Sequence, residues 1–562
     1  MLSSAAGILV AVALAVSPLA VHAGAPSEPT LRGPSAGVEA TSLPSVIIAR
    51  VSFKSRADLD ELAERLDLTA AVDSEKRTVE AVLSPEEYGA LVKEGRRVEL
   101  LEEQTRIMNA PRDGMTTQAT NIPGYTCYRT VDATYAAMSQ LVTTYPNLAS
   151  WNDIGDSWDK VTAGGKVGDD MRVLVLTNKS RPGPKPRFFL MGAIHAREYT
   201  TAELAARFAE QLATRYGTDP EATWLLDYNE LHVVVQSNPD GRRVAETGLS
   251  KRKNTNTSQG SCTTTSWGVD LNRNSSFDWG GAGASTSVCN DTYRGRSLAS
   301  EPETQALENY ILSIFPDQRG PGSTDPAPAD ATGLLLSLHS YGGYVLYPWA
   351  TTTTAAPNAT QLRTLGRKFN YFNGYQACQV ASCLYAASGS TDAFSYGRLG
   401  VASFTFEMGG AFFESCTTFE NTIVPKNMPA LWYAFKAARR PYQNPAGPDS
   451  VSLSLSASTV AQGTSVTLTA QANDTRYGTN GGTETAQAIA AARYSIDAPS
   501  WVAGTPTYAL SAVDGTFNST LESVRATVFT SGLAPGRHTI FVESQDASGN
   551  WGVPTAIFLT VQ

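Results

Sequence analysis

One short stretch in the middle of the chain constrains the fold more than any other feature. The apolar run Phe188 to Ile194 leads directly into the segment HAREYTTAEL, which begins at His195. A run of four to eight apolar residues is typical of a buried strand. This strand ends on an imidazole and, three residues later, on the carboxylate of Glu198. Charged groups are costly to bury unless they are paired or bind a metal, so both side chains need a partner.

The surrounding segment, from about residue 120 to 440, alternates between two patterns. Strands are predicted at 171–178, 187–194, 230–237, 333–340 and 401–408, and helices at 201–217 and 302–315. Buried strands that alternate with helices predict an α/β domain with a largely parallel or mixed sheet. Functional side chains in such sheets gather just beyond the strand ends.

Two smaller regions flank this domain. Residues 45–110 are predicted to run strand, helix, strand, helix, strand, with Ser55 capping the first helix and a capping box from Ser84 to Glu87 at the second. This order predicts a small open-faced α/β sandwich. Residues 450–562 alternate apolar and polar residues between Gly, Asn and Asp, which predicts an antiparallel β-sandwich of immunoglobulin-like type.

The beginning of the chain predicts export. Residues 4–21 are apolar and uncharged, and small residues surround Ala23, as in a signal peptide and its cleavage site. The usual basic segment before them is missing, so an uncleaved membrane anchor is the alternative. Pro18 interrupts the run, and no later segment is apolar enough to span a bilayer. We therefore expect a signal peptide at 1–23, a secreted protein and no stable membrane insertion.

Polar connectors are expected between these parts. They lie at 25–44, 108–122 and 440–450 and are rich in Pro, Gly, Ser or other polar residues. The connector at 108–122 contains Arg112 and is expected to be an exposed site where proteolysis is easy.

Charge and cysteine content exclude some classes of protein. The net charge is −9, whereas nucleic-acid-binding proteins usually present a basic face, so no nucleic acid is expected as a partner. The six cysteines form no paired CxxC zinc pattern. An even number in an exported chain suggests three disulfides, although counting alone leaves 15 pairings open.

Histidines are rare enough to be considered one by one. The chain has five: His22, His195, His232, His339 and His538. His22 falls in the predicted signal peptide, His232 lies within a strand and is interpreted as structural, and His538 is interpreted as a surface residue. His195, Glu198 and His339 give two imidazoles and a carboxylate at the ends of two strands. This is a zinc ligand set of the catalytic kind, which leaves one position for water.

Further polar residues stand near these candidates. Asn272 and Arg273 in VDLNRN could grip a carboxylate by several donors, or form only a loop turn. Arg252 lies in the basic cluster SKRKN, for which a solvated surface is the alternative. Glu407 ends an apolar alternation, where a carboxylate needs a role or a partner. Asp270 could accept the second N–H of a histidine ligand and so fix its tautomer.

From about 120 to 440 the chain resembles zinc metallocarboxypeptidases of the carboxypeptidase A/B type, especially the secreted bacterial carboxypeptidase T-like members. The motifs HARE, NPDG, RKN, VDLNRN, HSY, LYAASGSTD and FTFE occur in the family's order. The resemblance implies a mixed-sheet α/β fold and one zinc ion per chain, held by His195, Glu198 and His339. It implies that peptide and protein C-termini are the substrates.

The same resemblance implies a role for each remaining candidate. Asn272 and Arg273 correspond to the pair that binds the substrate's terminal carboxylate, and Arg252 to the arginine that stabilises the oxyanion. Tyr385 corresponds to the family's mobile tyrosine, which also holds the carboxylate. Glu407 corresponds to the general base.

Substrate selection is implied by three further positions. Arg197 and Tyr341 correspond to outer subsite residues. Asp392 corresponds to the position at the floor of the pocket for the terminal side chain, where an acid goes with Lys and Arg substrates. The second acid common in the family is missing here, so a mixed basic and apolar preference is expected. Alternatively, Asp392 turns aside and bonds the backbone of its own turn.

The resemblance also implies processing and cross-linking. Residues 45–110 resemble the family's inhibitory pro-segment, so the enzyme would be made as a zymogen. Cys262 with Cys289 matches a bridge of the family. Cys378 with Cys383 would be a short local closure, and Cys127 with Cys416 is the remaining pair. We expect a monomer, and the sequence indicates no partner for the β-sandwich.

Two other functions remain as alternatives. Another zinc amidohydrolase on the same scaffold, such as a deacylase or a peptidoglycan-trimming enzyme, would share the three metal ligands. A surface adhesion protein with an inactive middle domain would have lost one of the candidate residues, and none is lost.

Overall fold

The computed structural model describes residues 43–562 except 111–119, 163–165 and 263–264. The predicted signal peptide, most of the 25–44 connector and the Arg112 site lie outside the described residues. Among the described helices, none is both long and apolar enough to cross a bilayer.

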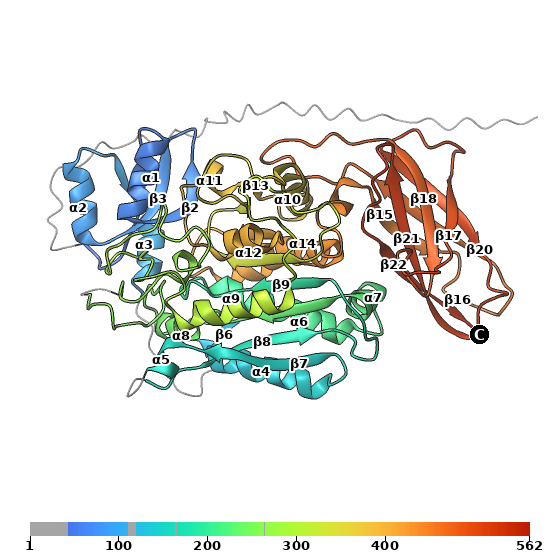
Figure 1. Cartoon of the computed structure of the whole chain (residues 1–562), viewed down its shortest axis with the longest axis horizontal. Coiled ribbons are helices and arrows are strands. Elements are labelled where there is room, and N and C mark those ends of the chain that lie inside the picture. The colour runs from blue at the N-terminus through green and yellow to red at the C-terminus, as the bar shows by residue number, and fades with distance from the viewer. Residues whose placement is uncertain (1–42, 111–119, 163–165, 263–264) are drawn as a thin grey trace, which may run out of the picture. The chain divides into compact units, whose positions relative to one another are not determined.

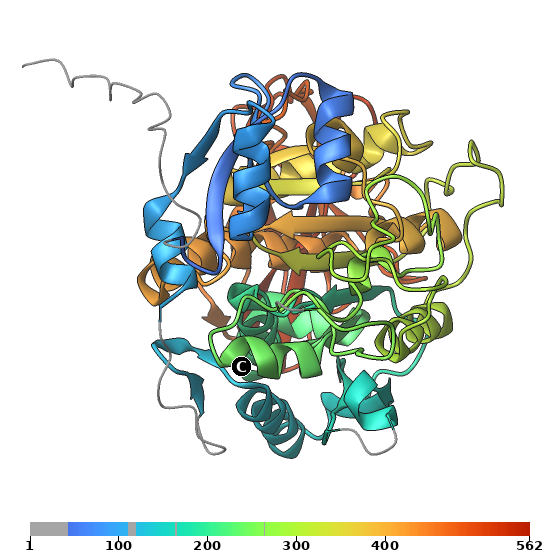
Figure 2. The same ribbon diagram turned by 90° about the vertical axis from the view of Figure 1, so that its left-hand side faces the viewer.

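The N-terminal region is a four-stranded antiparallel sheet in the order β2-β3-β1-β4, with helices α1 and α2 on one face (Figure 2). Its elements are β1 (Ile47–Ser52), α1 (Arg56–Arg65), β2 (Asp67–Asp73), β3 (Thr78–Leu83), α2 (Pro85–Lys93), β4 (Val98–Leu100) and α3 (Glu102–Met108). Ser55 caps α1, and Ser84 with Glu87 forms the predicted capping box of α2. The sequence did not predict β2 or α3, because the Ala-rich segment of β2 shows no clear alternation.

The main domain is built on an eight-stranded mixed sheet in the order β13-β12-β14-β11-β9-β10-β8-β7 (Figure 1). The strands are β7 (Ala149–Asp156), β8 (Asp170–Leu176), β9 (Arg187–Met191), β10 (Glu230–Val234), β11 (Leu334–His339), β12 (Tyr344–Tyr347), β13 (Gln376–Gln379) and β14 (Ala402–Glu407). All five predicted strands are confirmed, and β7, β12 and β13 are additional. The neighbours β10, β9, β11 and β14 run parallel, so their carboxyl ends meet at one edge.

Helices cover both faces of this sheet, which explains why its strands are apolar without alternation. One face, with Phe188 and Leu336, packs against α6 (Tyr199–Arg215), α10 (Ala359–Asn373) and α14 (Val424–Ala437). The other face, with Phe189 and Leu335, packs against α9 (Pro302–Ile314) and α12 (Thr391–Leu399). The predicted helices at 201–217 and 302–315 are thus confirmed as α6 and α9.

The C-terminal region contains eight strands in the order β15-β17-β20-β19-β18-β21-β22-β16. They are β15 (Asp449–Leu455), β16 (Thr459–Val460), β17 (Val466–Asn473), β18 (Ile489–Ile496), β19 (Tyr508–Ala512), β20 (Leu521–Val528), β21 (Gly536–Asp546) and β22 (Thr555–Val561). Strand β19 pairs with both β20 and β18 and joins the two halves, whose inner faces share one apolar core. This arrangement fits the predicted β-sandwich.

Three disulfides link the described cysteines. The pairs are Cys127–Cys416, Cys262–Cys289 and Cys378–Cys383, and they agree with the expected pairings. The bridge Cys262–Cys289 closes the long loop that carries Asp270, Asn272 and Arg273.

Candidate active site

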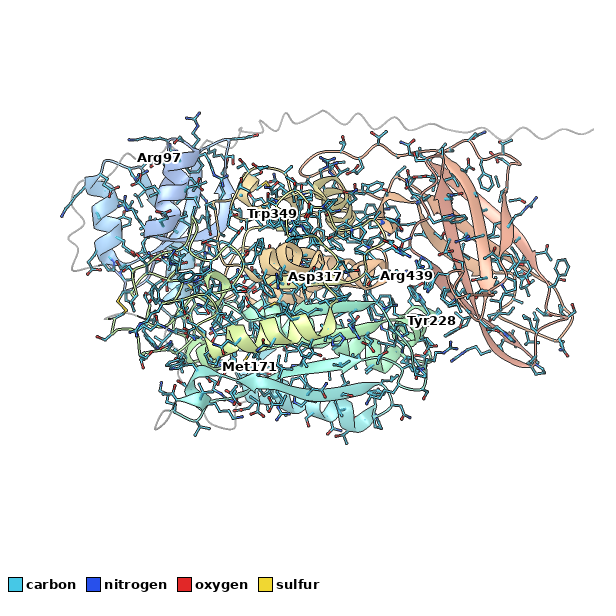
Figure 3. The ribbon with its side chains drawn as sticks, in the orientation of Figure 1. Arg97, Met171, Tyr228, Asp317, Trp349 and Arg439 are labelled. Carbon is cyan, nitrogen blue, oxygen red and sulfur yellow. A yellow bond between two sulfur atoms is a disulfide. The ribbon has the colours of Figure 1, made fainter. Side chains whose placement is uncertain are left out.

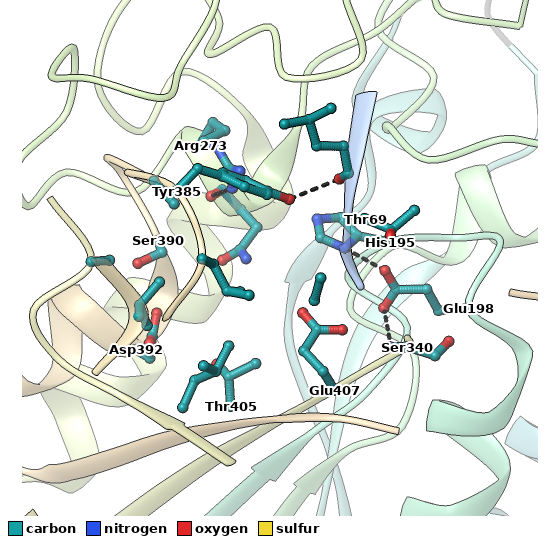
Figure 4. Close-up of a pocket in the computed structure, with 18 of the residues that line it drawn as sticks. Thr69, His195, Glu198, Arg273, Ser340, Tyr385, Ser390, Asp392, Thr405 and Glu407 are labelled. Carbon is teal, nitrogen blue, oxygen red and sulfur yellow. Dashed lines mark hydrogen bonds and ion pairs between the residues drawn. The ribbon is translucent and has the colours of Figure 1, made fainter. Parts of the chain in front are cut away.

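Three side chains converge at the carboxyl edge of the parallel strands. Figure 4 shows two of them, His195 and Glu198, in contact with each other. His195 and Glu198 follow β9, and His339 ends β11. His195 Nδ1 lies 2.7 Å from Glu198 Oε1 and 3.1 Å from His339 Nδ1. His339 Nδ1 lies 3.2 Å from Glu198 Oε2. The structure therefore brings together the three residues that the sequence indicated as metal ligands.

The donor set fits a bound dication. Ligand atoms about 2.0–2.2 Å from a tetrahedral zinc ion lie roughly 3.3–3.6 Å apart. The separations in this cluster, 2.7–3.2 Å, are somewhat shorter, so a small outward shift would admit the ion. The Nδ1 atoms of His195 and His339 face each other, and a cation between them would satisfy both lone pairs. All three residues are buried. Burial opposes ionisation of Glu198, but the two histidines lower the pKa of its carboxyl group.

The second ring nitrogen of each histidine, Nε2, also has a hydrogen-bonding partner. Asp270 Oδ1 lies 3.2 Å from His195 Nε2, and Ser337 Oγ lies 3.0 Å from His339 Nε2. Such contacts orient the rings and leave each Nδ1 for a metal. Asp270 also accepts bonds from Arg252 Nε and Nη2 at 3.1 and 2.9 Å. Burial opposes ionisation of Asp270, yet Arg252 holds its pKa well below the usual range.

Ser337 was missed by sequence reasoning. It stands two residues before His339 on β11, so both side chains lie on the same face of the strand. That spacing is the signal that could have identified it. The backbone N–H of Ser340 also donates to Glu198 Oε2, at 3.1 Å, which no sequence pattern indicates.

Glu407 stands opposite this cluster. It ends β14, whose register with β11 places it beside His339. Its carboxylate points into the cavity (Figure 4). Burial raises the pKa of Glu407 to about 8, and His339 opposes this shift. A dication at the cluster would favour the ionised form further, because opposite charges stabilise each other at short range.

Hydrogen-bond donors line the same cavity. Arg273 Nε donates to Gly283 O at 2.7 Å and Nη1 to Asn272 O at 2.9 Å, which fixes the guanidinium group. Asn272 Oδ1 accepts the N–H of Thr391 at 3.2 Å, and its amide N–H groups have no acceptor among the described residues, which leaves them for a ligand. Asn272 and Arg273 lie in a short 3-10 turn, as the turn alternative expected, and both also line the wall of the cavity.

The basic cluster around Arg252 is buried, so the solvated-surface alternative is wrong. Arg252 is 6% exposed, and its neighbours Lys251 and Lys253 are 0% and 1% exposed. Both lysine ammonium groups donate to backbone carbonyls of the segment 262–290. These bonds hold the loop that is closed by the Cys262–Cys289 bridge and that carries Asn272 and Arg273.

Asp392 lies in the first turn of α12 and lines the cavity with Leu346, Val380 and Thr405. It is 4% exposed. Within the described ranges no hydrogen bond or ion pair engages its carboxylate, so it does not bond the backbone of its own turn. The pocket wall at this point combines apolar side chains with one acid.

Strand β2 covers the cavity. Leu68, Thr69 and Ala70 line it together with the candidate catalytic residues, and the remaining volume is about 60 Å³. The Tyr385 hydroxyl donates to Leu68 O at 2.7 Å. The backbone of β2 thus occupies the space beside Asn272, Arg273 and Tyr385.

Charged and polar residues anchor this N-terminal region next to the cavity. Asp67 Oδ2 lies 2.5 Å from Arg197 Nη2, and Asp67 Oδ1 lies 4.0 Å from Arg252 Nη1. Burial raises the pKa of Asp67, and Arg197 opposes this shift. The Tyr341 hydroxyl donates to Glu80 Oε2 at 3.0 Å. Arg197 and Tyr341 therefore face the N-terminal region just outside the cavity.

The two remaining described histidines have structural partners. His232 Nδ1 lies 2.8 Å from the hydroxyl of Tyr310. His538 is 8% exposed and bonds Asp497 at 2.7 Å and Ala534 O at 2.8 Å, so its interpretation as a surface residue is wrong. Its two partners come from adjacent loops, which the sequence pattern does not reveal.

Comparison with known proteins agrees with this geometry. A family model described as zinc carboxypeptidase matches residues 134–427. Carboxypeptidase A1 of Bos taurus is 30% identical over 317 residues, which cover 55% of this chain and 68% of that protein. Zinc carboxypeptidase A 1 of Drosophila melanogaster is 28% identical over 305 residues, covering 52% of this chain and 64% of that protein.

Solved structures share the fold. The crystal structure of carboxypeptidase A from Helicoverpa armigera superposes with a TM-score of 0.56 at 21% identity, over 71% of this chain and 98% of that one. Thrombin activatable fibrinolysis inhibitor superposes with a TM-score of 0.54 at 19% identity, over 70% of this chain and 98% of that one. Both matches cover a larger share of the chain than residues 120–440 make up, so they extend into the regions that flank this segment.

Proposed function

Because this chain belongs to the zinc carboxypeptidase family and is therefore a hydrolase of C-terminal peptide bonds, we propose that it is a secreted zymogen that releases C-terminal Lys and Arg, with apolar residues also accepted. One observation carries the proposal. One cavity is lined by His195 and Glu198 of the His-Glu-His cluster, by the partly buried Glu407 and by the donors Asn272 and Arg273.

We assign the zinc ion to His195, Glu198 and His339, where it would polarise the scissile carbonyl and lower the pKa of a water molecule. Glu407 accepts a proton from the attacking water and passes it to the leaving amine. Arg252 keeps its Nε and Nη2 on Asp270, and its Nη1 remains to donate to the oxyanion that forms.

Selection of the chain end rests on the fixed donors. Asn272 and Arg273, with Tyr385, bind the terminal carboxylate of the substrate. An internal peptide bond offers no charge to Arg273, so cleavage is confined to the last residue. These donors favour a carboxypeptidase over the amidohydrolase alternative, which needs only the three metal ligands.

The preference for the terminal side chain rests on Asp392. Its carboxylate has no partner among the described residues and would pair with a Lys or Arg side chain. Leu346 and Val380 in the same wall would accept apolar side chains.

Inhibition before activation rests on residues 45–110, which we assign as the pro-segment. In support, β2 fills the cavity, Asp67 approaches Arg197 and Arg252, and Tyr385 is held by Leu68 O. The structural matches that extend beyond 120–440 also support a shared fold for this region. Cleavage at the Arg112 connector would release it.

The remaining assignments concern the whole protein. Three disulfides in the described part are typical of proteins outside the reducing cytosol and support secretion after removal of residues 1–23. We assign 120–440 as the catalytic domain and 450–562 as an immunoglobulin-like domain of unknown partner. We propose a monomer without nucleic-acid partners.

The test is the release of C-terminal residues from a panel of short peptides, before and after cleavage of the chain near Arg112. Each peptide is compared with its C-terminally amidated form and with a sample treated with a zinc chelator. Release of Lys and Arg after cleavage, its loss with the chelator and no action on amidated peptides are expected. Equal hydrolysis of amidated and free peptides would contradict the exopeptidase assignment.

A further inference from the structure

A second cavity, of about 360 Å³, lies between the end of α14 and the β-sandwich. Its volume falls in the range of small-ligand pockets. Its walls include Arg439, Arg493, Trp501 and Trp551. Figure 3 labels Arg439 at the end of α14. The proposed catalytic roles use none of these residues.

This cavity stands apart from the active site. The carbonyl of Ala438 accepts the N–H of Gly333 at 2.8 Å, so Arg439 follows a contact with the start of β11. His339 is at the other end of that strand. Six residues at about 3.3 Å each separate the two ends by roughly 20 Å. A ligand in the second cavity therefore leaves the catalytic cavity free.

Arg439 is a cation without an anionic partner. It is half-buried, and within the described residues no hydrogen bond or ion pair engages its guanidinium group. Within the described residues, the one aromatic ring that its guanidinium group covers is that of Trp501, with the ring centroid 4.4 Å away. Burial lowers the pKa of Arg439, and Glu543 opposes this shift only in part. Desolvated charges are costly unless a partner compensates them.

The other charges of the cavity are already paired. Arg493 Nε donates to Glu543 Oε2 at 3.0 Å, and Arg440 Nη1 lies 3.3 Å from Asp330 Oδ2. Among the described residues that line the cavity, Glu543 is the one acid against three arginines, so the lining has a net positive charge. The chain as a whole carries −9, so this local excess of positive charge is not a property of its general surface.

The neutral side chains in the wall include N–H donors in addition to acceptor oxygens. Neither indole N–H, from Trp501 or Trp551, has a hydrogen-bond acceptor within the described part of the chain. Guanidinium groups cover one face of each ring, Arg439 at 4.4 Å and Arg493 at 3.8 Å. One face of each ring is therefore unavailable to a stacked ligand. Donors around an unpaired guanidinium suit a carboxylate better than a stacked sugar ring.

We propose that this cavity binds the carboxylate side chain of an acidic peptide segment and gives peptide substrates a second contact remote from the active site. The choice of a peptide rests on the peptidase activity of the family. Arg439 receives the carboxylate, and the two indole N–H groups donate to its oxygens.

The test is calorimetric titration of the full chain with an acetylated and C-terminally amidated tetrapeptide, Gly-Glu-Glu-Gly, at physiological salt. The amide end removes the group that the active site selects. The matched peptide carries Gln in place of both Glu residues, and galacturonic acid serves as the sugar-acid probe. The acidic peptide should bind, and the Gln peptide should not.

Two variants locate the site. Arg439→Gln should weaken binding of the acidic peptide at least about tenfold, in line with a lost hydrogen bond to a charged group. Arg525→Gln, which removes an exposed arginine of β20, should leave binding unchanged. If Arg439→Gln fails to fold, Arg439→Lys keeps the charge but loses the planar fork, and it should weaken binding less.

Three results would overturn the proposal. They are no binding of the acidic peptide to the wild-type chain, equal binding in the Arg439 and Arg525 variants, and tighter binding of galacturonic acid than of the peptide. Because the ligand is amidated, binding here is measured without turnover, so loss of catalysis would not imitate any of these results.

Discussion

The carboxylates of Glu198, which is buried, and Glu407, which is partly buried, line one cavity, but their neighbours separate their roles. Two histidine Nδ1 atoms face Glu198, whereas Glu407 has none of the short contacts of a ligand set. We expect Glu198→Ala to lose the metal, because one of three protein ligands is removed. Glu407→Gln should keep the metal and reduce kcat about 10²- to 10⁴-fold, the usual effect of losing a general base.

Metal content and turnover, measured on the same samples, check this pair of variants. The wild-type chain should hold one zinc ion. A near-normal kcat of the Glu407→Gln variant would show that Glu407 is not the general base, whatever the metal content of that variant.

Asp392 is the residue that sets substrate preference in our proposal. Asp392→Asn keeps the size of the side chain and removes its charge. Truncating one partner of a buried charge pair typically costs about 2–5 kcal/mol, so kcat/KM for peptides ending in Arg should fall about 30-fold or more. Peptides ending in Phe should be affected little and serve as the control. An equal fall for both substrates would mean that Asp392 supports the pocket without selecting the side chain.

Much of the site could be predicted at the level of residues because its candidate metal ligands and candidate base stand at, or just after, the ends of apolar strands. His195, His339 and Glu407 all end such runs, and parallel strands bring their ends together. Arg252 was harder, because its burial depends on Asp270, which stands 18 residues later in the chain. Ser337 was missed because a serine within an apolar strand carries no signal of its own.

Among the secondary-structure elements, β2 has the clearest expected effect on activity. Its residues lie over the cavity, and Asp67 is buried against Arg197 with Arg252 nearby. Asp67→Asn removes the charge that holds this strand to the two arginines. The uncleaved chain should therefore become measurably active on short peptides, while the chain cleaved near Arg112 should be unchanged.

A matched change controls for general loosening of the N-terminal region. Glu99→Gln removes a half-exposed ion pair with Arg50 within the same small sheet and should leave the uncleaved chain inactive. If Asp67→Asn does not raise the activity of the uncleaved chain, the Asp67 contact does not contribute to inhibition.

The elements themselves were predicted unevenly, and the reason is physical. Long buried strands and capped helices carry their signal locally, as at β9, β11 and α2. Strand β2 is short of such a signal, since its register over the cavity is fixed by contacts with residues more than 100 positions away. Strands β12 and β13, at one side of the sheet, are only four residues long, too short for a periodic pattern.

At the scale of the whole molecule, a buried ion pair joins the main domain to the β-sandwich. Lys368 of α10 is 0% exposed, and its ammonium group donates to Asp449 Oδ1 of β15 at 3.1 Å. It also lies 4.1 Å from the Tyr477 ring centroid. Asp449 has a second partner in Arg476, at 3.2 Å. Nearby, the backbone N–H of residue 377 donates to Asn480 O, so a sandwich loop covers the edge strand β13.

The two halves of this ion pair should differ in their effect on stability. Asp449→Ala leaves the Lys368 ammonium group buried without its counter-charge, which typically costs about 3–5 kcal/mol. Lys368→Met should cost less, because Asp449 keeps Arg476 and the new side chain is apolar. Urea unfolding followed by tryptophan fluorescence measures both, with Arg525→Gln as an exposed control expected within about 0.5 kcal/mol of the wild type. A free energy of unfolding for Asp449→Ala no lower than that for Lys368→Met would show that the ion pair does not hold the sandwich to the main domain.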